Sequence, residues 1–329
     1  MKFISRRTVT NVMFATAILA LGGFAHAEKI NLRLGFATQV DDPAGHAAQK
    51  MADVVSQLTK GEVVIKIFPN AQLGNDVEMV NGVRSGTIDV VLVGGGEAAS
   101  AVAPKVQVTS LPFIWKSRET FWKTLRGPIG QELLAEFERA GIKGLAWGNY
   151  GTRGFITNGF QINGPEDLKG RKIRVTPSQV YMKSMQAMGG NAIPMPYGEV
   201  YMALQQHAVD GVETSFWAMV GAKFYEVASS VADTSHEIDS ALFLMNKNTF
   251  DGLNPQTQKA IIEGATAGGE VMNEEINQAT DTALGVMKKA GLTITHPDPS
   301  KFKNLVQPVY AQFAKQIGQK LIDEIQAQQ

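Results

Sequence analysis

The chain has 329 residues, with 31 Lys and Arg against 31 Asp and Glu, and it contains no cysteine. A balanced charge argues against a nucleic-acid or anionic-membrane partner, because proteins that bind these carry a basic excess. The absence of cysteine excludes a disulfide framework, a thiol nucleophile and a lipid-modified cysteine. The length favours two domains, and the hydrophobic content of 44% is typical of a well-packed globular chain.

The first 27 residues are predicted to be a signal peptide. Lys2, Arg6 and Arg7 form its basic end, an apolar run follows over residues 12–21, and an Ala-His-Ala cleavage motif ends at Ala27. Ten apolar residues are too few to span a bilayer, so no membrane insertion is expected. Removal of this segment takes away three cations and no acidic residue, so the mature chain has 31 − 3 = 28 basic against 31 acidic residues and a net charge of −3. We therefore expect a periplasmic protein, exported by either the general or the twin-arginine route.

Predicted strands alternate with predicted helices from residue 30 onward. The expected strands are 30–37, 63–69 and 88–94, and the expected helices are 44–61 and 75–86. Repeated strand–helix–strand units predict a doubly wound α/β lobe with ligand sites outside the carboxyl ends of the strands. Gly95 lies at such a strand end, inside Gly94–Gly96. Because no Lys-Ser/Thr pair follows, we interpret this glycine run as a place where the backbone approaches a ligand, not as a phosphate loop.

Two arginines near the middle of the chain are the main candidates for ligand binding. Residues 141–151 are expected to cross from the first lobe to the second, and Arg153 follows at the end of a short strand. Arg174 lies in the strand RKIRVTP, which Pro177 ends. Two guanidinium groups at strand ends that face one space would bind an anion, most naturally a carboxylate. Arginines in strands also serve as surface charges or in structural salt bridges, and spacing alone does not decide between these roles.

The rest of the second lobe supplies further candidates. Residues 191–213 are expected to form a strand, a turn, a helix and a strand, with Tyr197 at the amino end of the helix and free to face a cleft. Trp217 could shape the pocket, although aromatic side chains at such spacing also serve in packing. One long helix is expected over 254–290 and a last helix over 302–325.

Several motifs resemble one family of transport proteins when their order and spacing are taken together. The motifs are IFPNAQLG at 67–74, SGTID at 85–89, N-x-x-x-R-x-x-x-T-N at 149–158, I-x-x-P-E-D-L-K-G-x-K-I-R-V at 162–175, P-M-P-Y-x-E-V-Y-x-A-L-Q at 194–205, V-D-G-x-E at 209–213 and ITHPDPSKF at 294–302. Between Leu32 and about Gln316 the chain resembles the extracytoplasmic solute-binding proteins of TRAP-type (tripartite ATP-independent periplasmic) transporters, the DctP-like family.

The resemblance implies a two-lobe periplasmic-binding-protein fold of the type II kind. Each lobe would be a mixed sheet flanked by helices, with the long helix spanning both. The expected lobes are 28–150 with about 239–278, and 151–238 with about 279–329. The implied partners are a small organic acid and the membrane permease subunits of a TRAP transporter. The expected ligand-binding residues are Arg174, Arg153, Thr214, Tyr197, Trp217, Gly95 and Gln39.

The resemblance also assigns roles to single residues. The family uses an aromatic side chain at the position of Tyr197 to cover the ligand. In many relatives an asparagine follows the motif glutamate, and Thr214 replaces it here. Because Thr214 is shorter and lacks the amide, the ligand cannot be carried over from any one relative. It could be a C4-dicarboxylate, a keto or hydroxy acid, or a sugar acid.

Motifs of other function classes are lacking in the sequence. No H-E-x-x-H motif, Cys/His metal spacing or G-x-S-x-G motif occurs, so neither a metal nor a cofactor nor catalysis is expected. Glu199 and Glu213 could in principle form the acid/base pair of a secreted hydrolase acting on a carboxylated sugar, but we interpret them as partners of the arginines. A binding protein of an ABC importer or a sensor also remains open.

Overall fold

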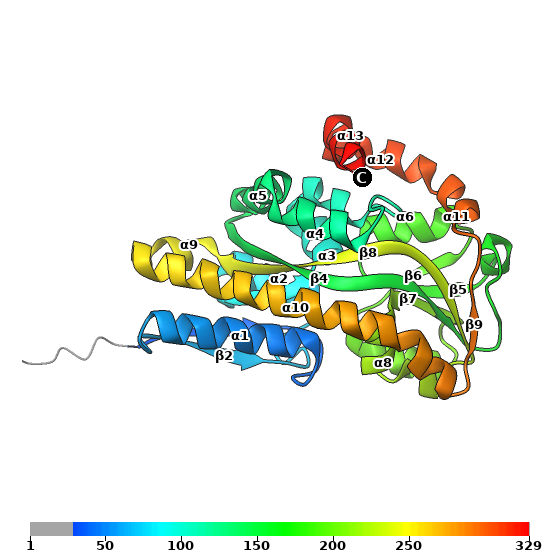
Figure 1. The fold of residues 1–329 in the computed structure, drawn as a ribbon, viewed down its shortest axis with the longest axis horizontal. Coiled ribbons are helices and arrows are strands. Elements are labelled where there is room, and N and C mark those ends of the chain that lie inside the picture. The colour runs from blue at the N-terminus through cyan, green and yellow to red at the C-terminus, as the bar shows by residue number, and fades with distance from the viewer. Residues whose placement is uncertain (1–28, 329) are drawn as a thin grey trace, which may run out of the picture.

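The computed structural model describes residues 29–328, which are built around one nine-stranded mixed sheet (Figure 1). Its strands are β1 (Ile30–Gly35), β2 (Val63–Phe68), β3 (Val90–Gly94), β4 (Ile142–Thr157), β5 (Lys172–Val175), β6 (Asn191–Pro194), β7 (Gly211–Ser215), β8 (Ser230–Asn246) and β9 (Thr293–Thr295). The strand order is β2-β1-β3-β8-β4-β7-β5-β6, and β9 pairs with β8. The predicted signal peptide and its cleavage site lie outside the described residues.

Two long strands join the two halves of this sheet. β4 has 16 residues and β8 has 17, and they pair antiparallel along most of their length. β3 pairs with the carboxyl end of β8, and β7 pairs with the carboxyl end of β4. We call β2-β1-β3 the first half and β7-β5-β6 the second half; each half contains parallel pairs. The expected two-lobe α/β fold is confirmed, and its two halves form one continuous sheet through β4 and β8.

Helices cover both faces of the sheet (Figure 1). The α-helices are α1 (Pro43–Leu58), α2 (Asp76–Ser85), α3 (Gly95–Val102), α4 (Arg118–Arg126), α5 (Pro128–Ala135), α6 (Gln179–Ala187), α7 (Val200–Gln205), α8 (Phe216–Gly221), α9 (Lys247–Asp251), α10 (Pro255–Lys289), α11 (Pro299–Leu305), α12 (Gln307–Ile317) and α13 (Gln319–Ala327). The short 3-10 helices are η1 (Pro104–Ser110), η2 (Glu136–Ala140), η3 (Pro165–Leu168), η4 (Tyr197–Glu199) and η5 (Phe224–Glu226).

The long helix α10 runs alongside both halves. It has 35 residues and begins at Pro255, with Asn254 as its N-cap. It packs on α1 in the first half, on β4, and on α8 in the second half. Close contact with β4 requires a glycine on the helix, because a Cβ at Gly269 would overlap the backbone oxygen of Trp147. The expectation of a long helix across both lobes is confirmed.

Two predicted segments differ from the structure. The helix expected over 302–325 is three helices, because α12 begins anew at Gln307 with Pro308 in its first turn, and Gly318 adopts φ +94° between α12 and α13. The crossing at 141–151 and the strand around Arg153 are one continuous strand, β4. Its register shifts between Asn149 and Gly151 and again between Arg153 and Phe155, so the strand bends beside Arg153. A bend of this kind changes the direction of nearby side chains, and Arg153 beside it lines the cavity between the two halves.

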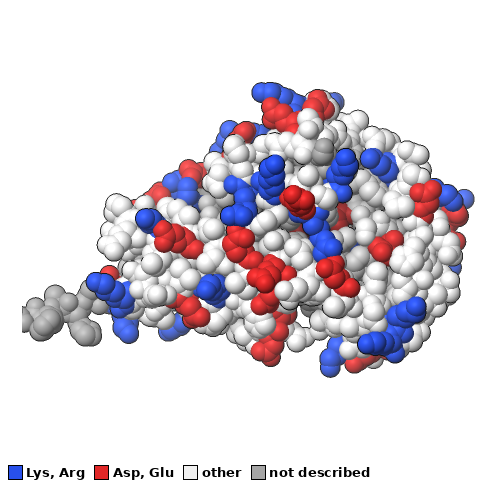
Figure 2. All heavy atoms as spheres, in the orientation of Figure 1, with Lys and Arg blue, Asp and Glu red and all other residues white. Residues whose placement is uncertain are grey.

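Charged residues of both signs are interspersed on the face shown in Figure 2. This face therefore offers no extended field of one sign that would attract a polyanion. In the described part of the chain, no helix combines the length and the apolar character needed to cross a membrane.

Candidate functional site

A narrow cavity lies between the two halves of the sheet. The space between its walls is about 430 Å³, including the open mouth. Helices and strand ends of both halves line it. The lining residues are Ala37, Thr38, Asp76, Gly94, Glu97, Tyr150, Arg153, Arg174, Thr176, Tyr181, Tyr197, Thr214, Ala218 and Asp239. The position matches the expected place for a ligand, outside the carboxyl ends of the parallel strands.

Arg174 is a buried cation with no ion-pair partner among residues 29–328. It lies in β5 between the apolar Ile173 and Val175, and 1% of its surface is exposed. One edge of the guanidinium donates to the backbone oxygen of Met195, from Nε at 3.0 Å and from Nη2 at 2.8 Å. Nη1 lies 3.5 Å from Oγ1 of Thr176. The edge on Met195 fixes the guanidinium plane, and the remaining donors are available in the cavity.

Arg153 is equally buried, but carboxylates already surround it. Its Nε and Nη2 donate to the two oxygens of Glu213, at 2.5 and 2.8 Å, and its Nη1 donates to Oδ2 of Asp239 at 2.7 Å. Nη2 also lies 3.2 Å from Oγ1 of Thr176, and the guanidinium carbon lies 4.4 Å from the centre of the Tyr181 ring. The salt-bridge alternative thus describes much of the role of Arg153. One Nη1 hydrogen has no partner among the described residues.

The pKa values of these groups reflect the difference between the two arginines. Burial would lower the pKa of Arg153, but Glu213, Tyr181 and Asp239 together outweigh burial and raise it. Burial would likewise raise the pKa of Glu213, but Arg153 holds it down at about 2. Arg174 lacks such a partner, and burial lowers its pKa. The charge of Glu97, in the same cavity, offsets part of the effect of burial, but no carboxylate among residues 29–328 forms an ion pair with Arg174. An anionic ligand in direct contact would stabilise this buried cation.

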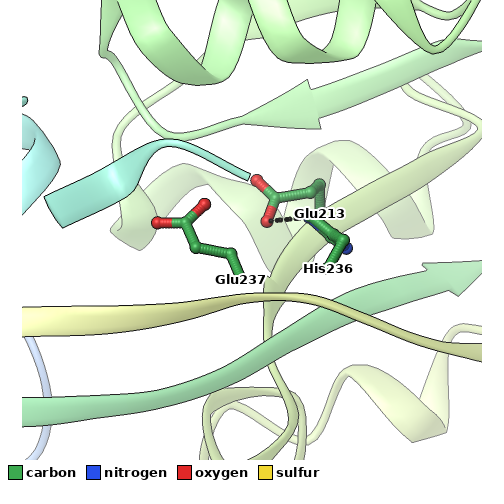
Figure 3. A group of neighbouring side chains, drawn as sticks. All are labelled: Glu213, His236 and Glu237. Atoms are coloured by element: carbon green, nitrogen blue, oxygen red, sulfur yellow. Dashed lines mark ion pairs between the residues drawn. The ribbon is translucent and has the colours of Figure 1, made fainter. Parts of the chain in front are cut away.

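Glu213, His236 and Glu237 form a buried group of neighbouring side chains (Figure 3). Their ligand atoms lie within 4.8 Å of one another, which is close enough to share a metal ion. However, both oxygens of Glu213 accept from Arg153, and Nδ1 of His236 lies 2.7 Å from Oγ1 of Thr234. Nε2 of His236 is 3.4 Å from Glu213. Within this group Glu213 is the residue that holds Arg153 in place, and His236 lies against Glu213. Oε1 of Glu237 is buried without a hydrogen-bond partner in the described chain. Glu199, the other carboxylate named as an arginine partner, is exposed.

Two further carboxyl groups line the cavity from the first half. Asp76 is the first residue of α2, and Glu97 lies in the first turn of α3. They are 6% and 8% exposed. Burial raises the pKa of Asp76 to about 6, against the opposing charge of Arg174. Burial, and then the charge of Asp76, raise the pKa of Glu97 well above its usual range.

The aromatic side chains divide between lining and support. Tyr197 lines the cavity, and its hydroxyl donates to the backbone oxygen of Ala218 at 3.1 Å. Tyr150 also lines it and packs edge-on against Trp217, with ring centres 5.6 Å apart. Trp217 donates from Nε1 to the backbone oxygen of Tyr150 at 2.7 Å. Trp217 therefore supports a lining residue without itself lining the cavity.

Four of the seven expected residues line the cavity: Arg174, Arg153, Thr214 and Tyr197. Trp217, Gly95 and Gln39 do not. Gly95 packs against β8, where an added Cβ would overlap Oγ of Ser240. Gln39 is exposed, and its side-chain nitrogen lies 3.4 Å from the backbone oxygen of Gly221. Because Gln39 follows β1 and Gly221 ends α8, this contact joins the two halves.

Sequence reasoning missed several lining residues, above all Asp76, Glu97, Tyr150, Tyr181 and Asp239. Asp76 and Glu97 looked like ordinary acidic residues of a first helical turn. A signal was nevertheless present for both, since each follows a strand of the parallel first half, where ligand sites are expected. Asp239 and Tyr181 carried no such signal.

The raised pKa of Asp76 predicts a stability effect that depends on pH. A pKa raised from 3.8 to about 6 means that Asp76 contributes stability below about pH 4 and loses it as pH rises through about 6. We expect Asp76→Asn to gain stability relative to the parent chain between pH 4 and pH 7, by up to about 3 kcal/mol. Urea unfolding at a series of pH values measures this difference. A difference that stays constant, or that falls over this range, would contradict the buried, strained carboxylate.

Comparisons with known proteins agree with this geometry. Residues 34–316 match the family described as bacterial extracellular solute-binding protein, family 7. The 2,3-diketo-L-gulonate-binding periplasmic protein YiaO of Escherichia coli is 33% identical over 97% of this chain and 99% of its own. The C4-dicarboxylate-binding periplasmic protein DctP of Rhodobacter capsulatus is 29% identical, over 98% of each chain.

A solved structure with the same architecture holds a ligand. It is a TRAP periplasmic solute-binding protein from Polaromonas sp. JS666 bound to D-erythronate, with a TM-score of 0.88 and 29% identity over 91% of this chain and 99% of that one. The family match covers most of the chain, in keeping with the TRAP resemblance of its motifs. This chain belongs to family 7 of the bacterial extracellular solute-binding proteins, the DctP family of TRAP transporters.

Proposed function

We propose that the protein captures a small carboxylate-bearing solute in the cavity between its lobes and delivers it to the permease subunits of a TRAP transporter. The observation that carries this proposal is Arg174, a buried guanidinium that lines the cavity and forms no ion pair among the described residues. Its geometry suits a carboxylate, because the planar fork is already held on Met195 and offers its other donors together.

Arg153 has a smaller direct role in this proposal. With Glu213 and Asp239 occupying most of its donors, it offers one hydrogen to the ligand and otherwise positions Thr176 and Tyr181. Thr214 adds a hydroxyl, and Tyr197 covers the solute. A charge-assisted hydrogen bond contributes about 1.5–3 kcal/mol, so two or three such bonds with aromatic cover reach micromolar affinity.

Lobe closure would couple binding to delivery. The ligand bridges the two halves, so it stabilises the closed arrangement by the contacts that both halves make with it. Two direct contacts also join the halves. Gln39 lies against Gly221, and Oγ of Ser100 lies 2.9 Å from Oγ of Ser178. The predicted lobes, residues 28–150 with about 239–278 and residues 151–238 with about 279–329, are the bodies that would move.

Three further parts of the proposal come from the family and the sequence. The receptor acts in the periplasm after cleavage near Ala27, it docks on a large and a small permease subunit, and it releases the solute chemically unaltered. The organic acids named for the relatives support an acid as the solute, without choosing among dicarboxylates, keto or hydroxy acids and sugar acids.

The test is to identify the solute and to follow its fate. Mass spectrometry of the protein purified from the periplasm, after mild denaturation, should reveal a small organic acid. Calorimetry of the stripped and refolded protein should then give a micromolar or tighter dissociation constant for that acid. Recovery of a neutral solute would overturn the proposal. Conversion of the acid during incubation would favour a hydrolase instead.

A further inference from the structure

Asp76 and Glu97 together form what we call the acidic wall of the cavity. Both come from helices of the first half, whereas Arg174 belongs to β5 of the second half. We propose that the acidic wall accepts hydrogen bonds from hydroxyl groups of the solute and rejects a second carboxylate. The solute is then a hydroxylated monocarboxylic acid, not a dicarboxylic acid. This inference rests on the proposed function, in which Arg174 binds the solute's carboxylate.

Among the residues that the structure describes, few hydrogen-bond donors reach the carboxyl groups of the acidic wall, and the one that reaches Asp76 is its own backbone N–H. Oδ1 of Asp76 is buried without a hydrogen-bond partner. Glu97 is 8% exposed, and within residues 29–328 no donor to its carboxyl group is found. A buried carboxylate without donors is costly, and the molecule that fills the cavity is the natural source of them. Hydroxyl groups donate, whereas a carboxylate can only accept.

No structural task accounts for Asp76. Helix α2 is already capped by its neighbours, since Asn75 accepts from the backbone of Glu78 and Glu78 accepts from the backbone of Asn75. Asp76 stands next in the chain, makes no ion pair among the described residues, and lines the cavity. Its position in a first helical turn makes the negative charge tolerable, because the helix dipole favours an anion there.

The charges that line the cavity allow for one carboxylate on the solute. The two cations are Arg153 and Arg174, and Arg153 is neutralised by Glu213 and Asp239. Arg174 is therefore the one cation left for a ligand among the described lining residues. A second carboxylate on the solute would meet Asp76 and Glu97 in a water-poor space, where like charges repel strongly. The charge of Asp76 adds to burial in raising the pKa of Glu97, so one negative charge in this wall already disfavours a second one beside it.

Matched acids test the inference directly. At four carbons the probes are erythronate, tartrate and succinate, and at six carbons they are galactonate, galactarate and adipate. Each set holds a hydroxylated monoacid, the hydroxylated diacid and the plain diacid. Calorimetry on the stripped protein gives a dissociation constant for each acid. In the set whose chain length binds better, we expect the hydroxylated monoacid to bind about 100-fold more tightly than either diacid. A hydroxylated diacid that binds as tightly as the monoacid, or no binding by any probe, would overturn the inference.

Variants of the acidic wall connect this selectivity to its residues. In Asp76→Asn and Glu97→Gln we expect the preference for the monoacid over the diacid to fall about tenfold or more. Glu199→Gln, which neutralises an exposed carboxylate outside the cavity, should leave that ratio unchanged. Thermal melting identifies any variant that fails to fold, and the remaining one of the pair then decides. An unchanged ratio in a folded wall variant refutes the inference.

The Arg174→Ala variant separates this inference from the proposed function. If Arg174→Ala abolishes binding of every acid while the wall variants change no ratio, the proposed function stands and the inference falls. If Arg174→Ala binds the acids as the parent chain does, the proposed function falls, and the inference falls with it.

Discussion

Arg174→Ala is expected to weaken binding of the solute by at least about 100-fold, with little loss of folding. The guanidinium contacts the fold mainly through the Met195 carbonyl, so its removal breaks two hydrogen bonds to one acceptor. What the variant loses is the one cation that forms no ion pair among the described residues that line the cavity. Calorimetry with the co-purified acid measures the change.

Two companion variants sharpen this result. Arg174→Lys keeps the charge but loses the planar fork, so it should recover only a small part of the affinity. Arg171→Ala removes an exposed arginine three residues earlier, one that stacks on Phe160 at 4.3 Å and lies outside the cavity. It should bind as the parent chain does. Equal losses in Arg171→Ala and Arg174→Ala would mean that general charge, not a built site, holds the acid.

Arg153→Ala is expected to destabilise the fold by about 3–5 kcal/mol. The substitution leaves Glu213 and Asp239 buried with no counter-ion, and both are at most 4% exposed. Chemical unfolding measures the loss. The ion pair of Arg126 with Glu270 is exposed, so Arg126→Ala is the matched control and should cost less than about 1 kcal/mol.

A second substitution tests the reason for that loss. If the cost comes from stranded negative charge, Arg153→Ala combined with Glu213→Gln should recover part of the stability, because one of the two unpaired carboxylates is gone. If the stability losses of Arg153→Ala and Glu213→Gln simply add in the double variant, the packing of the guanidinium on Tyr181 matters more than the charge.

Local sequence rules were sufficient for much of the fold and for the strand that carries Arg174, a lining residue of the cavity. Alternation in RKIRVTP placed Arg174 on a strand whose neighbours Ile173 and Val175 are buried, and Pro177 set the strand's end close to where β5 ends. The helices of the first half and α10 followed from apolar periodicity and caps. These features depend on residues within one element.

The partners of Arg153 could not be read in the same way. Glu213 and Asp239 lie 60 and 86 positions further along the chain, and only the pairing of β4 with β7 and β8 brings them together. Nothing local distinguishes a guanidinium that meets two carboxylates from one that meets a ligand. The same limit applies to Asp76 and Glu97, whose burial depends on the approach of the second half.

A structure of the protein with its co-purified acid is the most direct test. The account predicts that two oxygens of the solute's carboxylate lie about 2.7–3.2 Å from the guanidinium nitrogens of Arg174, inside the cavity between the two halves of the sheet. A carboxylate bound elsewhere, with Arg174 still donating only to Met195 and Thr176, would contradict it.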